Sequence, residues 1–208
     1  GLYTLTYDGD YGFDGFIQQG GAATDAQMAD YIIGFLTHGL WQSSGMDEAE
    51  HSFGCSTLTV RSPEGGVLFG RNYDWQDCDI LIVKTKPEQG YASVSTCCLD
   101  FLSFGDGWKP EGVINQMMAL AAVYVPLDGM NEKGLCIADL MAGDKTETHQ
   151  RSDKPDVTTV AAIRLLLDKA ATVDEALALL AQYDMHSSNG MAHHFALADA
   201  SGRAVVVE

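Results

Sequence analysis

The sequence has few basic residues. Its 208 residues include only 12 Lys and Arg against 29 Asp and Glu, which gives a formal net charge of −17. Because no basic face can be assembled from so few cations, the composition argues against binding of a nucleic-acid backbone. We expect the acidic excess to keep the protein soluble and to repel anionic substrates weakly.

Long apolar runs are also absent. No run approaches the roughly 20 apolar residues that cross a bilayer, so we expect no membrane span. No charged-then-apolar leader precedes Tyr3, so we expect that any secretory signal peptide has been removed. The compartment stays open, and a secreted or cell-envelope protein is the favoured interpretation. The apolar content of 46% and charged content of 20% are those of an ordinary globular protein. The length suits one domain or a large part of one.

Cysteine is scarce and follows no paired pattern. The odd number of five cysteines includes no C-x-x-C pair, their positions being Cys55, Cys78, Cys97, Cys98 and Cys136. This pattern is poor for a zinc site or a disulfide framework, so we expect no metal and no cofactor. We interpret four of these residues as small buried hydrophobes. Cys55 differs because of its surroundings.

Two common arrangements for amide hydrolysis are missing as well. There is no G-x-S-x-G nucleophile elbow and no Cys-His-Asn set at a familiar spacing. His193 and His194 alternate across a predicted strand, so at most one of them faces any site, and a structural histidine is the simpler interpretation.

The most informative stretch is a predicted hairpin around Cys55. Residues 56–60 alternate apolar with hydroxylic side chains, residues 62–66 form a Pro- and Gly-containing turn, and a second strand starts at Val67. Such a hairpin brings Cys55, at the head of the first strand, close to Arg71 and Asp74 at the tail of the second.

These residues resemble the opening of the cysteine N-terminal-nucleophile hydrolases. The resemblance is to the choloylglycine hydrolase, penicillin V acylase and acid-ceramidase-like group, which cleaves linear amides. It is carried by three motifs between residues 54 and 208: Cys55-Ser56-Thr57 with Gly70-Arg71-Asn72-Tyr73-Asp74-Trp75, then Asp128-Gly129-Met130-Asn131-Glu132-Lys133-Gly134-Leu135, then Ala198-Asp199-Ala200-Ser201-Gly202. The resemblance implies an α+β fold, a four-layer αββα sandwich whose C-terminal part is missing from this chain.

The resemblance also implies a mechanism and a set of residues. Autocatalytic cleavage of the Gly54–Cys55 bond frees the Cys55 α-amine, which titrates near pH 8 and serves as the base in place of histidine. The Cys55 thiolate attacks the substrate carbonyl, and Arg71 favours the thiolate. Asp74 orients the amine and thiol, and Asn131 donates to the oxyanion.

Three functions remain open at this point. The first is hydrolysis of a small-molecule N-acyl amide. The second is a narrower specificity within that chemistry, for bile-salt conjugates, acyl-ethanolamides or penicillin V. The third is an arrested precursor or non-catalytic relative that binds amphipathic ligands. As partners we expect a second half of the chain or a second subunit, and a homo-oligomer is left open.

The chain order predicts two parts. Residues 1–54 form a mostly helical leading segment, either a pro-peptide or a first subunit, and residues 55–208 form the hydrolase domain, incomplete at its C-terminus. We expect residues 55–61, 67–72, 80–85 and 91–98 to form one antiparallel sheet. The apolar stretch 114–125 is consistent with a buried strand, or with a short helix followed by a strand. Further helices are expected at residues 159–170 and 173–181.

Overall fold

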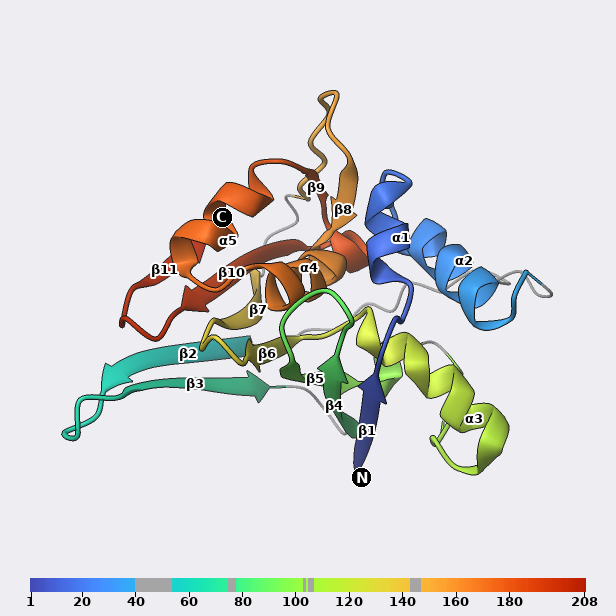
Figure 1. Cartoon of the computed structure of the whole chain (residues 1–208), viewed down its shortest axis with the longest axis horizontal. Coiled ribbons are helices and arrows are strands. Elements are labelled where there is room, and N and C mark those ends of the chain that lie inside the picture. Colours follow the sequence, from blue (N-terminus) through green and yellow to red (C-terminus); the bar gives the residue numbers. More distant parts are fainter. Residues whose placement is uncertain (40–53, 75–77, 103, 105–106, 143–146) are drawn as a thin grey trace.

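The computed structural model describes residues 1–39, 54–74, 78–102, 104, 107–142 and 147–208. The fold class is α+β, as predicted, and its centre is a seven-stranded mixed sheet in the order β1-β4-β5-β6-β7-β10-β11 (Figure 1). The strands of this sheet are β1 (Leu2–Asp8), β4 (Ile80–Lys86), β5 (Ser93–Cys98), β6 (Asp128–Asn131), β7 (Cys136–Ala142), β10 (Ala192–Ala198) and β11 (Ala204–Val207).

The predicted hairpin is present but forms a sheet of its own. β2 (Gly54–Arg61) and β3 (Val67–Asp74) pair antiparallel around the expected turn, where Gly65 adopts φ +89°. The prediction of one four-stranded sheet is wrong. β4 pairs with both β1 and β5, and β5 pairs with both β4 and β6, so neither strand has a free edge for this β2–β3 ribbon to join.

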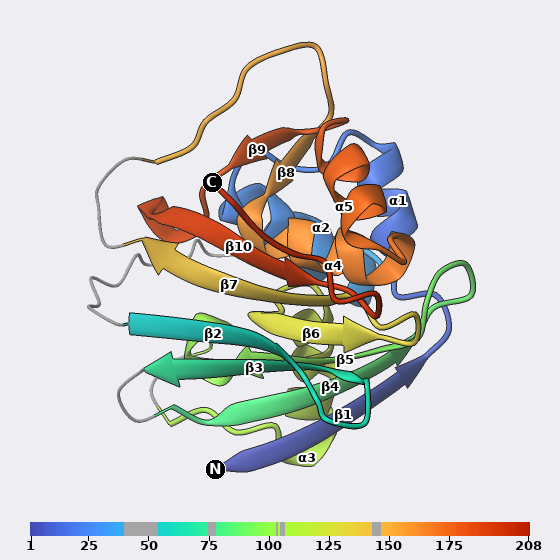
Figure 2. The ribbon, with the colours of Figure 1, turned by 90° about the vertical axis from the view of Figure 1, so that its left-hand side faces the viewer.

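Helices cover one face of the large sheet, and the ribbon lies across the other (Figure 2). The helices are α1 (Phe13–Gln18), α2 (Asp25–Leu36), α3 (Gly112–Met118), α4 (Thr159–Lys169) and α5 (Val173–Leu180), with 3-10 helices η1 (Leu99–Leu102), η2 (Ala119–Val123) and η3 (Ser188–Gly190). A small parallel pair, β8 (Asp156–Thr158) and β9 (Asp184–His186), completes the described elements. None of the described helices is long and apolar enough to cross a membrane.

The predicted helices at residues 159–170 and 173–181 are confirmed as α4 and α5. α4 packs on β6 and β7, with Ile163, Leu166 and Leu167 fully buried. A Cβ at Gly129 would lie 2.8 Å from Leu167 Cδ1, so this glycine is what allows α4 to approach the sheet closely. Residues 114–125 contain no strand, because α3 and η2 occupy them.

The leading segment is built into the core. β1 pairs in parallel with β4 along its whole length, while Phe13 and Phe16 are buried in a cluster of aromatic rings around Tyr124. The Tyr11 hydroxyl donates to the Asp168 carboxylate of α4 at 2.6 Å. Residues 1–39 therefore supply a strand and apolar packing to the same body as the rest of the chain.

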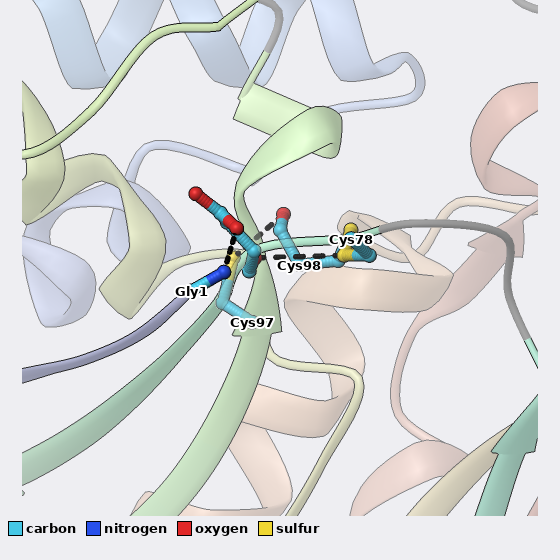
Figure 3. Close-up of a disulfide and its surroundings, with 5 residues drawn as sticks. Gly1, Cys78, Cys97 and Cys98 are labelled. Atoms are coloured by element: carbon cyan, nitrogen blue, oxygen red, sulfur yellow. Dashed lines mark hydrogen bonds and ion pairs between the residues drawn. A yellow bond between two sulfur atoms is a disulfide. The ribbon is translucent and has the colours of Figure 1, made fainter.

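Two cysteines that we interpreted as buried hydrophobes form a disulfide. Cys78 and Cys98 are joined with their Cα atoms 6.2 Å apart, which links the segment after β3 to the end of β5 (Figure 3). The cysteine spacing did not predict this disulfide, because the two residues are 20 positions apart in the sequence and come together only when β4 and β5 pair. Asp100 lies near both sulfurs, but disulfide-bonded sulfurs offer no thiolate to a metal.

Replacing Phe16 with Ala tests whether the leading segment belongs to the cooperative core. The ring is fully buried, so we expect Phe16→Ala to lower the free energy of unfolding by about 3–5 kcal/mol. Leu2→Ala, at a side chain that is 70% exposed in the same segment, is the control and should cost about 0.5 kcal/mol or less. Urea denaturation followed by circular dichroism measures both. Equal effects would show that the segment unfolds separately from the sheet.

Candidate active site

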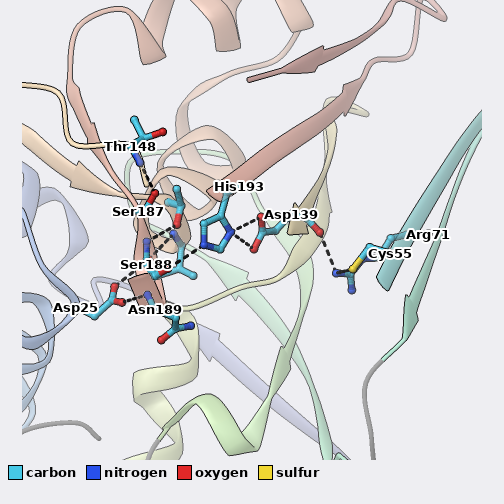
Figure 4. Close-up of polar contacts among 11 residues, drawn as sticks. Asp25, Cys55, Arg71, Asp139, Thr148, Ser187, Ser188, Asn189 and His193 are labelled. Carbon is cyan, nitrogen blue, oxygen red and sulfur yellow. Dashed lines mark hydrogen bonds and ion pairs between the residues drawn. The ribbon is translucent and has the colours of Figure 1, made fainter. Parts of the chain in front are cut away.

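Cys55 and Arg71 meet on the inner face of the β2–β3 ribbon. Cys55 is opposite Tyr73 in the ribbon register, and the Arg71 Nη2 lies 3.5 Å from the Cys55 sulfur (Figure 4). The Arg71 guanidinium also lies 4.4 Å from the centre of the Tyr73 ring, a cation–π distance. Side chains on one face of a strand alternate in sequence, so Arg71 and Tyr73 share the face that carries the thiol.

The edge of β7 positions this pair. β6 begins at Asp128. Toward the C-terminal end of β7, the last backbone hydrogen bond between the two segments is donated by the Asp139 N–H to the carbonyl of Leu127, the residue before β6. Beyond that point the edge of β7 has no neighbouring strand among the described residues. The Asp139 carbonyl accepts from Arg71 Nη2 at 3.0 Å, and the Met141 N–H donates to the Cys55 sulfur. The ribbon thus satisfies backbone groups that β6 leaves unpaired.

Asp128 holds the other end of the guanidinium. Its Oδ2 lies 3.0 Å from Arg71 Nη1, and its Oδ1 accepts from the Thr96 hydroxyl at 2.7 Å. Arg71 is nearly buried, with an 8% exposed side chain. A carboxylate on one side and a carbonyl on the other therefore hold the guanidinium in a fixed orientation beside the thiol.

The surroundings act on the Cys55 thiol in opposite directions. Burial raises its pKa most strongly, while the Arg71 charge and the Met141 N–H lower it, and the Asp139 charge raises it. The net effect is a pKa above the ordinary value. In this arrangement the thiol is protonated at neutral pH, and Arg71 only limits the effect of burial.

Asp74 does not lie beside the thiol. Its side chain is exposed on the opposite face of the ribbon and accepts from the Asn72 amide at 2.6 Å. Its backbone is paired with Gly54, and its Oδ2 lies 3.6 Å from the position of a Cβ on Gly54. The expected meeting of Cys55, Arg71 and Asp74 side chains is therefore not found. Asp74 lies instead beside the residue that precedes Cys55.

Asn131 also lies apart from the thiol. Its side chain is buried, and its Nδ2 donates to the Leu167 and Ala170 carbonyls at 3.0 and 2.7 Å. Its Oδ1 accepts from the backbone N–H groups of Lys133 and Leu135, at 3.1 Å each. Because both amide hydrogens are donated to α4 and its C-terminus, none is left for an oxyanion. In this structure Asn131 anchors the β6–β7 turn to α4, and its role at the oxyanion stays a prediction.

A buried polar pair behind the site was missed. His193 on β10 contacts the Asp139 carboxylate, and both line a cavity of about 30 Å³ with Asp25, Met28, Leu127 and Met141. The sequence feature that could have indicated this pair is Asp139, a charged residue inside the apolar run of β7. A buried carboxylate needs a partner, and the alternation of His193 and His194 left one histidine free to supply it.

The comparisons with known proteins agree with this fold. Residues 55–208 match the family described as linear amide C-N hydrolases, choloylglycine hydrolase family. The chain belongs to this family, as the motifs around Cys55 and Asn131 predicted. No curated protein matches the chain.

Solved structures of family members are similar but longer. Penicillin V acylase from Agrobacterium tumefaciens is 24% identical, with a TM-score of 0.39 over 57% of this chain and 30% of that one. Two variants of conjugated bile acid hydrolase from Clostridium perfringens are 18% and 20% identical, with TM-scores of 0.50 and 0.49 over 73% and 74% of this chain. The match covers 47% of each bile acid hydrolase chain, so this chain spans less than half the length of these proteins.

Replacing Asn131 separates anchoring from oxyanion binding. We expect Asn131→Ala to lower the free energy of unfolding by about 2–4 kcal/mol, because it leaves buried carbonyl and N–H groups without partners. Asn115→Ala is the control, since Asn115 makes one exposed bond, to the Lys109 carbonyl. Chemical denaturation measures both. A variant as stable as the parent that nevertheless loses hydrolysis would restore the oxyanion role.

Replacing Arg71 tests the electrostatics of the thiol. Since Arg71 lowers the Cys55 pKa, Arg71→Gln should move the midpoint of the pH-dependent alkylation rate upward. Alkylation at neutral pH should slow by roughly tenfold for each pH unit that the midpoint moves. Arg61→Gln is the matched control, because Arg61 lies on the same ribbon but contacts the Ser201 carbonyl. The rate of iodoacetamide labelling, read by peptide mapping, decides. An unchanged profile in Arg71→Gln contradicts the assignment.

Proposed function

We propose that this chain is the nucleophile-bearing part of an amidohydrolase that cleaves the linear amide bond of an N-acyl conjugate. The observation that carries the proposal is the Arg71 guanidinium, held between Asp128 and the Asp139 carbonyl with one nitrogen 3.5 Å from the Cys55 sulfur. A fixed cation beside a half-buried thiol stabilises the thiolate that attacks a carbonyl.

The proposed reaction begins with cleavage of the Gly54–Cys55 bond. Gly54 has no side chain to cover its carbonyl, and the adjacent thiol attacks that carbon. Hydrolysis then leaves a new α-amine on Cys55. Two features support the proposal that the continuous chain is a precursor at rest: the pKa of its thiol is raised, and the peptide nitrogen of Cys55 cannot act as a base. This is the form that the arrested-precursor alternative anticipates.

After cleavage the α-amine takes over the proton transfers. An α-amine titrates near pH 8, so it accepts the thiol proton as sulfur bonds to the substrate carbonyl and returns it to the leaving amine. Water then releases the acyl group as a carboxylic acid. Asp74, next to Gly54 across the ribbon, is proposed to hold the new ammonium group rather than the thiol.

The oxyanion is proposed to be stabilised by backbone and not by Asn131. The Met141 N–H already points at the Cys55 sulfur. In a tetrahedral intermediate the former carbonyl oxygen is bonded to the carbon next to sulfur, so an N–H in this position is close to the developing charge. The described residues favour none of the candidate substrates, bile-salt conjugates, acyl-ethanolamides or penicillin V, over the others.

We also propose that residues 1–54 remain bound after cleavage as a first subunit. β1 is hydrogen-bonded along β4, and the Tyr124 hydroxyl donates to the Tyr11 carbonyl at 2.5 Å. Breaking one peptide bond at Gly54 removes none of these contacts. We also expect residues 43–54 to lie over the site and block it in a precursor, but these residues lie outside the described part of the chain, apart from Gly54.

Cys55→Ser tests the thiol mechanism. We expect this variant to lose hydrolysis by about 100-fold or more, because a hydroxyl is far less ionised than a thiol. A panel of N-acyl amides that differ in acyl chain and head group, assayed for released amine, provides the readout and identifies the preferred substrate. Cys136→Ser is the control, since Cys136 is a free thiol on β7 and no part of the proposed site. Undiminished hydrolysis by Cys55→Ser would exclude the mechanism.

Mass measurement tests the cleavage step and the fate of the leading segment. We expect active protein to give two masses under denaturing conditions, split at Gly54–Cys55, and one co-eluting species under native conditions. Full activity from a chain still joined at this bond would contradict the N-terminal-nucleophile mechanism. Loss of the small fragment on native gel filtration would show that it is a released pro-peptide.

A further inference from the structure

His193 is the most enclosed histidine among the described residues that contact a carboxylate. Its side chain is 2% exposed and that of Asp139 is 4% exposed. The Nδ1 atom lies 2.9 and 3.0 Å from the two Asp139 carboxylate oxygens, and Nε2 lies 2.9 Å from the Ser188 carbonyl (Figure 4). Both ring nitrogens are therefore at hydrogen-bonding distance from protein oxygens.

The nature of these partners determines the protonation of the ring. A carbonyl oxygen only accepts, and an ionised carboxylate only accepts. A neutral imidazole donates from one nitrogen and leaves a lone pair on the other, which would face an oxygen across a buried contact. With Asp139 ionised, only the doubly protonated ring satisfies both contacts. The geometry therefore describes an imidazolium enclosed behind the sheet.

The charges around the ring agree with this description. Asp139 faces it from β7, and Asp25 faces it from the first turn of α2, where the Asp25 carboxylate accepts from the Ser188 hydroxyl and the Asn189 N–H at 2.9 Å each. Burial lowers the pKa of His193, but the Asp139 contact, the Ser188 carbonyl and the Asp25 charge outweigh it and raise the pKa above the ordinary value. The nearest cation in the network, Arg71, lies on the far side of Asp139.

Asp139 links this ring to the thiol. Its side chain binds His193, while its carbonyl accepts from Arg71 Nη2, which in turn lies 3.5 Å from the Cys55 sulfur. The Asp139 charge itself opposes the thiolate, since it raises the pKa of Cys55. A positive charge on His193 offsets the effect of the Asp139 charge on the Cys55 pKa. It also holds the segment of β7 whose Asp139 carbonyl binds Arg71.

We propose that His193 is a positioning residue of the thiol site: as a buried imidazolium it holds and neutralises Asp139, so that Arg71 is kept against Cys55. The catalytic significance of this role rests on the proposed function, but the charge of His193 and its effect on Cys55 can be measured without it. It assigns His193 no contact with substrate. A histidine that serves packing alone would stabilise the fold and leave the reactivity of the thiol unchanged.

The protonation state is tested on the unaltered protein by nitrogen NMR of the histidine rings. At pH 7.5 we expect both ring nitrogens of His193 to give the signals of protonated nitrogens. Asp139→Asn should return His193 to a single neutral tautomer. A neutral ring in the unaltered protein at pH 7.5 would overturn the proposal, and this measurement needs no variant to fold.

The positioning role is tested by the reactivity of Cys55 in His193→Gln. Glutamine fills a similar space and keeps an N–H donor but carries no charge. We expect iodoacetamide labelling of Cys55 at pH 7 to slow by about 3- to 10-fold, with the midpoint of the pH profile moved upward. His186→Gln is the matched control, because His186 also pairs with a carboxylate, Asp156 at 2.7 Å, on a strand of another sheet.

The outcomes separate the two claims. Slower labelling in His193→Gln with unchanged labelling in His186→Gln supports the proposal. Equal profiles for His193→Gln and the parent, or an equal decrease in both variants, contradict it. The labelling reports the thiol without any substrate, so hydrolysis that survives Cys55→Ser would refute the proposed function while the comparison of the two histidine variants still decides the role of His193.

Discussion

The site depends on the difference in length between β6 and β7. β7 continues past the point where β6 begins, and a strand edge with unpaired carbonyl and N–H groups needs partners. The β2–β3 ribbon supplies them, with Arg71 on the Asp139 carbonyl and the Cys55 sulfur on the Met141 N–H. The contact that seats the ribbon on the sheet is therefore the same contact that places a cation beside the thiol.

Buried charge extends from this contact in alternating sign. Asp128 pairs with Arg71, Arg71 also donates to the Asp139 backbone carbonyl, and the Asp139 carboxylate pairs with His193. Single buried charges are costly, and buried pairs persist where each member has a partner in good geometry. Such a chain couples the orientation of the guanidinium to residues on β6, β7 and β10. This coupling is the basis of our proposal that His193, which does not contact the thiol, influences its ionisation.

Local signals predicted the local structure well. The Thr24 and Thr172 side chains cap α2 and α5 by accepting from the backbone N–H groups of Gln27 and Glu175, and such a pattern can be recognised in the sequence because capping involves residues only a turn apart. The hairpin register and the proximity of Cys55 to Arg71 followed from one turn and period-2 alternation. The prediction that the Asp74 side chain joins Arg71 beside the thiol was wrong. Residues three apart in a strand point to opposite faces, so Asp74 and Arg71 cannot share one.

The sequence by itself determined the α+β class, the hairpin, the capped helices and the family, because these depend on neighbours in the chain or on motifs with fixed spacing. The tertiary structure alone decided that the hairpin forms a sheet of its own, that Asn131 anchors α4, that Cys78 meets Cys98, and that Asp139 binds His193. Each of these contacts joins residues brought together by strand pairing or helix packing. Their partners are chosen by which edges and buried polar groups the assembled fold leaves unsatisfied.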